Sequence, residues 1–353
     1  MAGAMLANSG VAKKLRAAAL GEEEEVDDPG VEAVKTVPRL TDRPAWDPAA
    51  LGLSPAFRLP RYAELRGRSC RPPSRLARAP LGFLGPAAPA PPEEGAGPGV
   101  ATDCTIVPIR LGGLSQLTTS DLFYPVVEDP YVMGRIACSS LLSDLYAMGV
   151  QDVDNILMYL GVCTKMSEAE RDKIVPLMLE GFKDCAREAG TRVTGGHTLL
   201  NPWLFIGGVA TAVSTVEEYI VPDGALVGDV LVLTKPLGTG VALNVQQWRG
   251  TERWGRIKLV LTDEEAVKAF RRAVDTMART NRTSALLMHK YSAHGATDIS
   301  GLGLLGHAQA LAGNQQNEVS FVIHNLPVIA KMGAVARACG NMFSLLQVSI
   351  FWF

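Results

Sequence analysis

A change of composition near residue 100 divides the chain and limits what each part can fold into. Up to about Gly99 the sequence is dominated by Ala, Pro, Gly and Arg, with the densest proline cluster at 86–92. Such a segment buries too little apolar surface to offset the entropy of ordering, so we expect residues 1–100 to be largely disordered. Within them, only 51–73 is expected to dock on a folded domain. After Ala101, apolar runs alternate with helical periods, which is the pattern of an α/β protein.

Size, charge and cysteine spacing narrow the class of protein. A chain of 353 residues that is 47% hydrophobic can bury a sizeable core, in roughly two domains. Its 34 basic and 36 acidic residues give a net charge of −2, which provides no general attraction for nucleic acid or for an anionic membrane. The six cysteines have neither CxxC pairs nor the dense spacing of a secreted disulfide scaffold, so we expect a cytoplasmic protein.

Two segments need a decision about membranes and targeting. Residues 193–216 carry no Asp, Glu, Lys or Arg, but they include several glycines and Pro202, so we interpret them as a loop and a buried strand. Residues 1–20 contain Lys13, Lys14 and Arg16 and no acidic residue. They are either a disordered leader or a mitochondrial presequence.

Periodicity predicts the main helices and strands. One helix is expected over 134–148 and another over 262–290. Ser167 and Glu170 form a capping box that begins a further helix, which should run to about Ala189 and stop at Gly190. Apolar runs bounded by turn residues predict strands at 155–162, 203–213, 229–233 and 318–323.

Four aspartates lie at or near the ends of apolar elements, and an aspartate at such a place is, taken alone, more often a helix cap or a turn former than a functional residue. Two carboxylates about 4 Å apart repel by roughly 4 kcal/mol at an effective dielectric of 20, so a convergent cluster requires a bound cation or protonation. Oxygen ligands suit Mg²⁺, which in turn bridges nucleotide phosphates. The residues are Asp103, Asp121, Asp144 and Asp298.

Glycine-rich segments supply a complementary feature. Residues 194–198 (Thr-Gly-Gly-His-Thr) precede an apolar strand and are either a phosphate-binding turn or merely a tight turn. The glycine-rich loops 235–240 and 301–307 offer either further backbone donors or close packing of backbone. His294 and His307 flank Asp298 without zinc-site spacing, so we expect structural roles.

Many collinear blocks resemble the eukaryotic selenophosphate synthetases, which are the selenide, water dikinases. The resemblance runs nearly continuously over 103–347, and residues 51–59 resemble the N-terminal arm of the vertebrate selenocysteine-bearing form. Blocks that carry it are Leu-Ser-Asp-Leu-Tyr-Ala-Met-Gly at 142–149, Leu-Thr-Lys-Pro-Leu-Gly-Thr at 233–239, Asn-Arg-Thr at 281–283 and Glu-Val-Ser-Phe-Val-Ile-His-Asn-Leu-Pro at 318–327.

The resemblance implies a two-domain α/β (α+β) fold like that of aminoimidazole ribonucleotide synthetase. Residues 101–215 would be an ATP-binding domain that also dimerises, through its sheet, to give a homodimer. Residues 216–353 would be a C-terminal domain, and we expect this domain to be incomplete because family chains continue beyond the matching region.

The resemblance also implies an activity and its residues. ATP, selenide and water would give selenophosphate, AMP and phosphate. Asp103, Asp144 and Asp298 would bind Mg²⁺, and Asp103 and Asp144 would thereby contact the nucleotide. Asp121 would lie against the phosphates, and Gly195, Gly196, His197 and Thr198 would bind the nucleotide.

The catalytic arm of that family carries Cys or selenocysteine, then Gly, Cys and Lys. In this chain the four aligned positions, 68–71, hold Arg68, Ser69, Cys70 and Arg71. A guanidinium is no selenide carrier, whereas Arg71 can still reach a phosphate and Cys70 keeps a thiol between two arginines. Two hypotheses follow: a selenophosphate-forming enzyme, or a nucleotide-binding regulatory homologue that does not make selenophosphate. A third keeps the fold and changes the substrate.

Overall fold

The computed structural model describes residues 2–8, 40, 43–60, 104–110, 112–301 and 303–340, with residues 2–8 described by their backbone alone. They form a five-stranded sheet of order β2-β3-β6-β4-β5 and a three-stranded sheet of order β7-β1-β8. The larger sheet contains β2 (Thr105–Pro108), β3 (Ser115–Phe123), β4 (Asn155–Cys163), β5 (Val193–Asn201) and β6 (Phe205–Ser214). The smaller contains β1 (Ala2–Asn8), β7 (Asp229–Leu233) and β8 (Gly295–Ile299).

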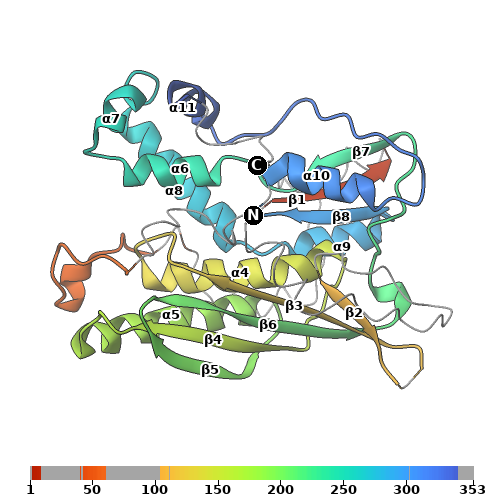
Figure 1. Cartoon of the computed structure of the whole chain (residues 1–353), viewed down its shortest axis with the longest axis horizontal. Helices are drawn as coiled ribbons and strands as arrows, with labels where there is room; N and C mark the ends of the chain where they lie inside the picture. The colour runs from red at the N-terminus through yellow and green to blue at the C-terminus, as the bar shows by residue number, and fades with distance from the viewer. Residues whose placement is uncertain are drawn as a thin grey trace.

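Helices lie between the sheets and around them (Figure 1). α4 (Pro130–Ala147) packs on β3 and β6 with one side and faces the C-terminal half with the other, while α5 (Glu168–Glu188) packs beside it. The C-terminal half carries α6 (Thr239–Gln247), α7 (Glu252–Ile257), α8 (Asp263–Ala278), α9 (Arg282–Lys290), α10 (Gly303–Gly313) and α11 (Met332–Ala338). Two short 3-10 helices cover Pro48–Leu51 and Val216–Glu218.

Helix α4 is buried along almost its whole length because it lies between the two halves of the molecule. It begins where the Asp129 carboxylate accepts hydrogen bonds from the backbone N–H groups of Tyr131 and Val132, at 2.9 and 3.2 Å. Pro130 occupies the first turn, where its missing N–H costs nothing. The prediction of a helix at 134–148 is therefore confirmed in type, and the cap moves its start four residues earlier.

Two glycines let α4 and α5 approach closely. A Cβ atom on Gly134 would lie 2.1 Å from the carbonyl oxygen of Met178, and one on Gly181 would lie 1.9 Å from that of Tyr131. The close contact brings the Tyr131 hydroxyl to 2.8 Å from the Asp184 carboxylate, to which it donates. Helix α4 is thus packed against α5 on one side and against the C-terminal half on another.

The predicted helix α5 and three of the predicted strands are confirmed. Ser167 and Glu170 form the expected capping box, and Gly190 follows the helix with a φ of 75°. β4, β6 and β7 lie at or within two residues of their predicted bounds. Residues 51–60 dock on the folded part of the chain, as expected, because Leu53, Phe57 and Leu59 are buried in the main core. Residues 61–73 lie outside the described part.

The prediction of one helix over 262–290 is wrong, because the structure has α8 and α9 with a break at 279–281. Arg279 adopts an extended conformation (φ −82°, ψ 130°), and its carbonyl oxygen accepts hydrogen bonds from Ser139 and Lys235 instead of from its own helix. Tertiary partners therefore override a helical periodicity that continues through the break.

Two further expectations, one about a strand and one about a loop, are also corrected, and a strand is present in a segment that the sequence left unassigned. Residues 318–323 form neither strand nor helix, and Val328 beyond them forms a parallel bridge with Leu237. Residues 303–307 begin helix α10 and are not a loop. Ala2–Asn8, inside the segment expected to be largely disordered, forms β1, which pairs antiparallel with both β7 and β8. Because its sequence shows no alternation of polar and apolar residues, this strand depends on its pairing with a neighbour on each edge.

Membrane insertion finds no support among the helices that the structure describes. None of them combines the length and the apolar character needed to cross a bilayer. The uncharged stretch at 193–216 forms β5, β6 and the start of a 3-10 helix instead.

Candidate functional site

Asp144 lies in the last turn of α4 and faces the larger sheet. The hydroxyl of Thr119 on β3 donates a hydrogen bond to its carboxylate at 2.7 Å. Asp121 is two residues farther along β3, so its side chain points to the same face as that of Thr119. Its carboxylate accepts a hydrogen bond from the N–H of Leu122 at 2.8 Å. Two of the predicted aspartates therefore share the space between β3 and the end of α4.

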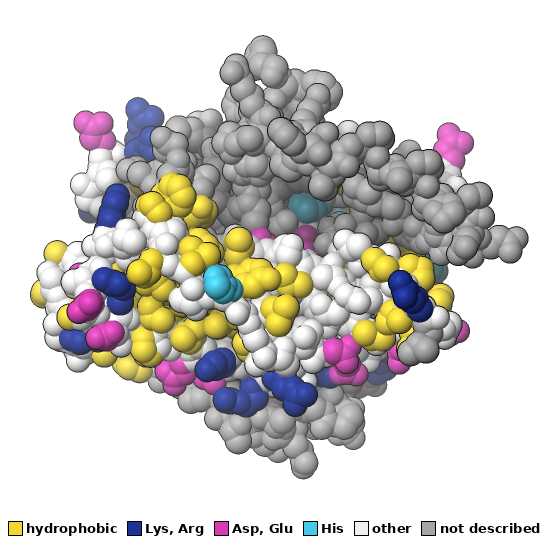
Figure 2. All heavy atoms as spheres, turned by 60° about the horizontal axis from the view of Figure 1, so that its bottom comes forward, with side chains coloured by type: hydrophobic (Ala, Val, Ile, Leu, Met, Phe, Trp, Pro, Cys, Tyr) yellow, Lys and Arg dark blue, Asp and Glu magenta, His cyan; other side chains and the backbone are white. Residues whose placement is uncertain are grey.

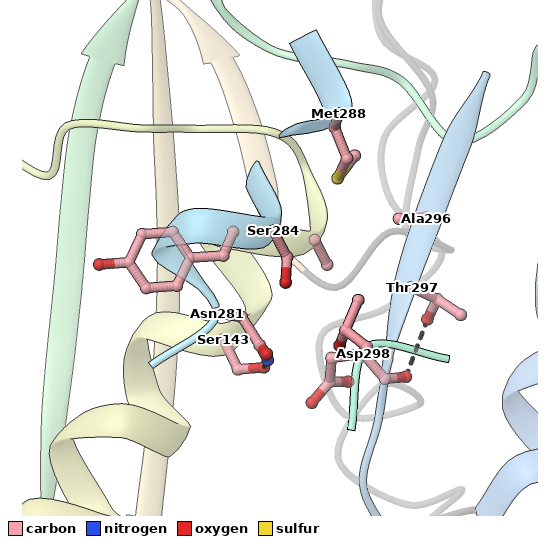
Figure 3. A pocket seen from close by; sticks show the side chains of 10 residues that line it. Ser143, Asn281, Ser284, Met288, Ala296, Thr297 and Asp298 are labelled. Atoms are coloured by element: carbon pink, nitrogen blue, oxygen red, sulfur yellow. Dashed lines mark hydrogen bonds between the residues drawn. The ribbon is translucent and has the colours of Figure 1, made fainter. Parts of the chain in front are cut away.

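Asp298 belongs to β8 in the C-terminal half and is 2% exposed. It lines a small pocket between the halves, together with Ser143, the neighbour of Asp144 on α4. Because α4 packs directly against β8, the structure brings the elements that carry Asp144 and Asp298 side by side. Figure 3 shows Ser143 and Asn281 on one side of this pocket and Thr297 and Asp298 on the other.

Residues Gly195–Thr198 are not where the sequence placed them. They lie inside strand β5 and not in a turn before a strand. Gly196 has a φ of 150°, and a Cβ atom there would lie 1.8 Å from the Met158 carbonyl oxygen, so the glycine serves close packing against β4. β5 is separated from β3 by β6 and β4, which is about 14 Å at ordinary strand spacing. Within one chain, these residues do not join the aspartates.

Four predicted residues lie outside the described part of the chain: Arg68, Cys70, Arg71 and Asp103. Among the described residues, no three His, Cys, Asp or Glu side chains gather as metal ligands. The predicted metal set of Asp103, Asp144 and Asp298 therefore stays a prediction, of which the structure places the last two.

The histidines near Asp298 have the structural roles expected for them. Nε2 of His307 accepts a hydrogen bond from the N–H of Ser300 at 3.2 Å, which ties α10 to the segment that follows Asp298. Nδ1 of His294 lies 2.8 Å from the Asp229 carboxylate.

Segment 279–289 joins the two halves through polar contacts that the sequence reasoning missed. The Ser139 hydroxyl donates to the Arg279 carbonyl at 2.9 Å, and the Asn281 amide donates to the Ser143 hydroxyl at 3.1 Å. His289 Nε2 lies 2.8 Å from the Gly149 carbonyl oxygen. The signal for this junction in the sequence was the Thr-Asn pair at 280–281, which are poor helix formers inside a predicted helix.

The role of the Lys235 side chain was also missed by the sequence reasoning, which considered only the backbone of its loop. Its side chain is buried, and its ammonium donates to the same Arg279 carbonyl oxygen that Ser139 uses. Burial, reinforced by the Arg279 guanidinium, lowers the pKa of Lys235 to about 7, although nearby groups including Asp298 act in the opposite direction. The junction thus holds a lysine that titrates near neutral pH.

Comparison with known families accounts for this arrangement of two halves. Residues 101–214 match the model described as AIR synthase related protein, N-terminal domain, and residues 227–345 match the corresponding C-terminal domain. Among solved structures, thiamine monophosphate kinase from Aquifex aeolicus is 20% identical, with a TM-score of 0.52 over 67% of this chain and 75% of that one. The class of protein is therefore an AIR synthase-like two-domain α/β fold.

Curated relatives narrow the class to one family. Human selenide, water dikinase 2 is 52% identical over 328 residues, which cover 86% of this chain and 73% of the relative. Selenide, water dikinase 3 of Danio rerio is 50% identical, with 86% and 72% covered, and selenide, water dikinase of Dictyostelium discoideum is 42% identical, with 82% and 77% covered. The chain belongs to the selenide, water dikinase family.

Proposed function

We propose that this protein uses ATP to make selenophosphate from selenide and water, releasing AMP and phosphate. The observation that carries the proposal is its 52% identity to human selenide, water dikinase 2 over 86% of the chain. The junction supports it, because carboxylates from both halves lie on elements that pack together, as a site for a charged nucleotide requires.

Mg²⁺ fits the residues of this site. Asp298 is a carboxylate with 2% exposure, and a buried carboxylate is costly unless its charge is balanced. Carboxylate oxygens are the donors that Mg²⁺ prefers, so Asp144 and Asp298, with Asp103, would hold it. When bound, the ion neutralises charge on the transferring phosphoryl groups. Asp121 would lie against the phosphates, and Thr119 orients Asp144 through the hydrogen bond described above.

We also propose a homodimer formed through the larger sheet. On the face of this sheet opposite α4, the side chains of Leu122, Leu157 and Val213 are exposed. Figure 2 shows apolar side chains gathered across this face. By strand register, His197 lies in the same row as Leu122 on that face. Because residues 195–198 lie far from the aspartates of their own chain, we propose that they contact nucleotide only within such a dimer.

A cytoplasmic location is the fourth part of the proposal. The cysteines in the described part of the chain are buried and form no disulfide, which suits a reducing compartment. Fluorescence imaging of the full chain, tagged at its C-terminus, tests this. Mitochondrial signal that disappears on deletion of residues 1–20 would instead support a presequence.

One sequence feature favours a second candidate function. Arg68 stands where the family's arm carries Cys or selenocysteine, which favours a regulatory homologue that binds nucleotide without making selenophosphate. Anaerobic incubation with ATP, Mg²⁺ and selenide, followed by phosphorus NMR, separates the two. Selenophosphate and AMP formed in equal amounts support the enzyme. Bound ATP without selenophosphate supports the homologue, and the variant Arg68→Cys is then expected to gain the activity.

A further inference from the structure

The pocket between the two halves contains a polar side chain whose position is unusual. Asn281 precedes helix α9, where an asparagine ordinarily bonds to an N–H group in the first turn of its own helix. Here it makes no such bond, and its amide donates instead to Ser143 on α4. The local cap is given up for a contact with the other half of the molecule.

The second polar atom of Asn281 is buried and has no hydrogen-bond partner among the described residues. This atom is the carboxamide oxygen, and the residue as a whole is 7% exposed. Figure 3 shows Asn281 facing Asp298 across the pocket. A buried acceptor without a donor costs about 1–3 kcal/mol, so a group that donates to this oxygen is expected in the gap.

The volume of the pocket indicates which donor to the Asn281 oxygen can fit. The cavity has a volume of about 20 Å³, whereas one water molecule needs about 10–15 Å³ measured in the same way. One water molecule fits this volume, and its two protons can serve two acceptors. The acceptors that face each other are the Asn281 oxygen and the carboxylate of Asp298.

We propose that a single water molecule in this pocket links the Asn281 carboxamide to the Asp298 carboxylate, and that Asn281 is thereby a positioning residue for Asp298. The link joins α9, which is tied to α4 of the N-terminal half, to β8 of the C-terminal half. The effect on cation binding rests on the proposed function, in which Asp298 is a ligand of Mg²⁺. The water link itself does not.

Three variants of the full chain test the role of Asn281. Asn281→Leu keeps the branching of the side chain at Cγ and removes its polar atoms, whereas Asn281→Asp keeps an acceptor at the same place. Thr280→Val makes the same kind of change, polar to apolar with the branching kept, one residue away and outside the pocket. The probe is Mn²⁺ alone, titrated without nucleotide and followed by electron paramagnetic resonance, with circular dichroism to establish that each variant is folded.

We expect Asn281→Leu to bind Mn²⁺ at least about 10-fold more weakly, as for other residues that orient a metal ligand, while Thr280→Val keeps the affinity. Asn281→Asp should bind Mn²⁺ at least as tightly as the wild type, because it adds a carboxylate that faces Asp298. Equal affinities for Asn281→Leu and Thr280→Val would overturn the positioning role. If Asn281→Leu does not fold, Ser143→Ala replaces it, because it removes the partner of the amide alone, and it is expected to weaken Mn²⁺ binding severalfold.

A crystal structure of the wild-type chain without metal tests the water link separately. Ordered water within hydrogen-bond distance of both Asn281 and Asp298 supports the link, and a dry pocket overturns it. Failure of the wild type to bind Mn²⁺ would count against the proposed metal site, and the link would then be judged from the crystal structure alone.

Discussion

The two regions assigned to the nucleotide from the sequence are built in opposite ways. At the junction, Asp298 is buried, Asp144 is held by Thr119, and Ser143 is held by Asn281, so side chains from both halves fix one another. On β5, residues 194–200 are exposed and depend on the backbone ladder to β4. The junction is organised within one chain, whereas the edge strand offers its surface to something else.

This contrast separates positions where the fold itself creates the chemistry from positions where an assembly must complete it. Buried carboxylates carry an electrostatic cost that a cation relieves, so they signal a ligand within a single chain. An exposed strand at the edge of a sheet signals a partner, because apolar and glycine-rich edges are otherwise poorly protected. Substitutions at the two regions should therefore fail in different assays.

The largest effect is expected from Asp298→Asn. Selenophosphate formation should fall by about 1,000-fold or more, about 4 kcal/mol in activation free energy, because the substitution removes a proposed ligand of the metal ion. The apo protein should nevertheless unfold at the same or a higher temperature, since an uncharged amide replaces a carboxylate that is 2% exposed. Phosphorus NMR and calorimetry without divalent cation measure the two. A normal rate would remove Asp298 from the site.

Lys235→Met should remove the part of the pH dependence of the free energy of unfolding that comes from this lysine. The folded pKa of about 7 lies below the ordinary value of 10.5, so between these values the unfolded chain binds more protons than the folded chain. The free energy of unfolding of the wild type should therefore rise with pH from about 7 to 10, by on the order of 1 kcal/mol per unit, from this lysine. Below about pH 7, its contribution should be constant.

Urea denaturation at several pH values measures this slope, and the difference between wild type and Lys235→Met isolates it from other groups. Exposed Lys258 gives a matched control, since Lys258→Met should keep the wild-type slope. Parallel curves for wild type and Lys235→Met would mean that the ammonium at the junction is not desolvated in solution.

The same contrast explains what the sequence could and could not predict. α5 was predictable because capping box and terminal glycine are local signals, and β7 because it is a short apolar run between turns. The break at 279–281 was not predictable, since its cause is the demand of Ser139 and Lys235 for one carbonyl oxygen. The aspartates were found as candidates by their places at element ends. Asn281 was missed because its partner is far away in the sequence.

At the edge strand, two neighbouring glycines give a matched pair. Gly196→Ala places a Cβ atom 1.8 Å from the Met158 carbonyl oxygen, whereas the nearest atom to a Cβ on Gly195 is a leucine methyl group at 3.4 Å. We expect Gly196→Ala to lower the free energy of unfolding by about 1–3 kcal/mol and Gly195→Ala by less than about 0.5 kcal/mol. Equilibrium urea denaturation measures both. Equal losses would mean that β5 does not pack on β4 in this register.

The smallest effect on stability is expected on the face of the larger sheet opposite α4. Leu122→Ser should change the stability of the isolated chain by about 1 kcal/mol or less, because the side chain is already 46% exposed, yet it should weaken self-association about 10-fold. Leu259→Ser is the control, since Leu259 is an exposed leucine of the C-terminal half, away from this sheet. Sedimentation velocity over a concentration series distinguishes them. Equal association constants would place the contact between subunits elsewhere and would leave residues 195–198 without a route to any nucleotide.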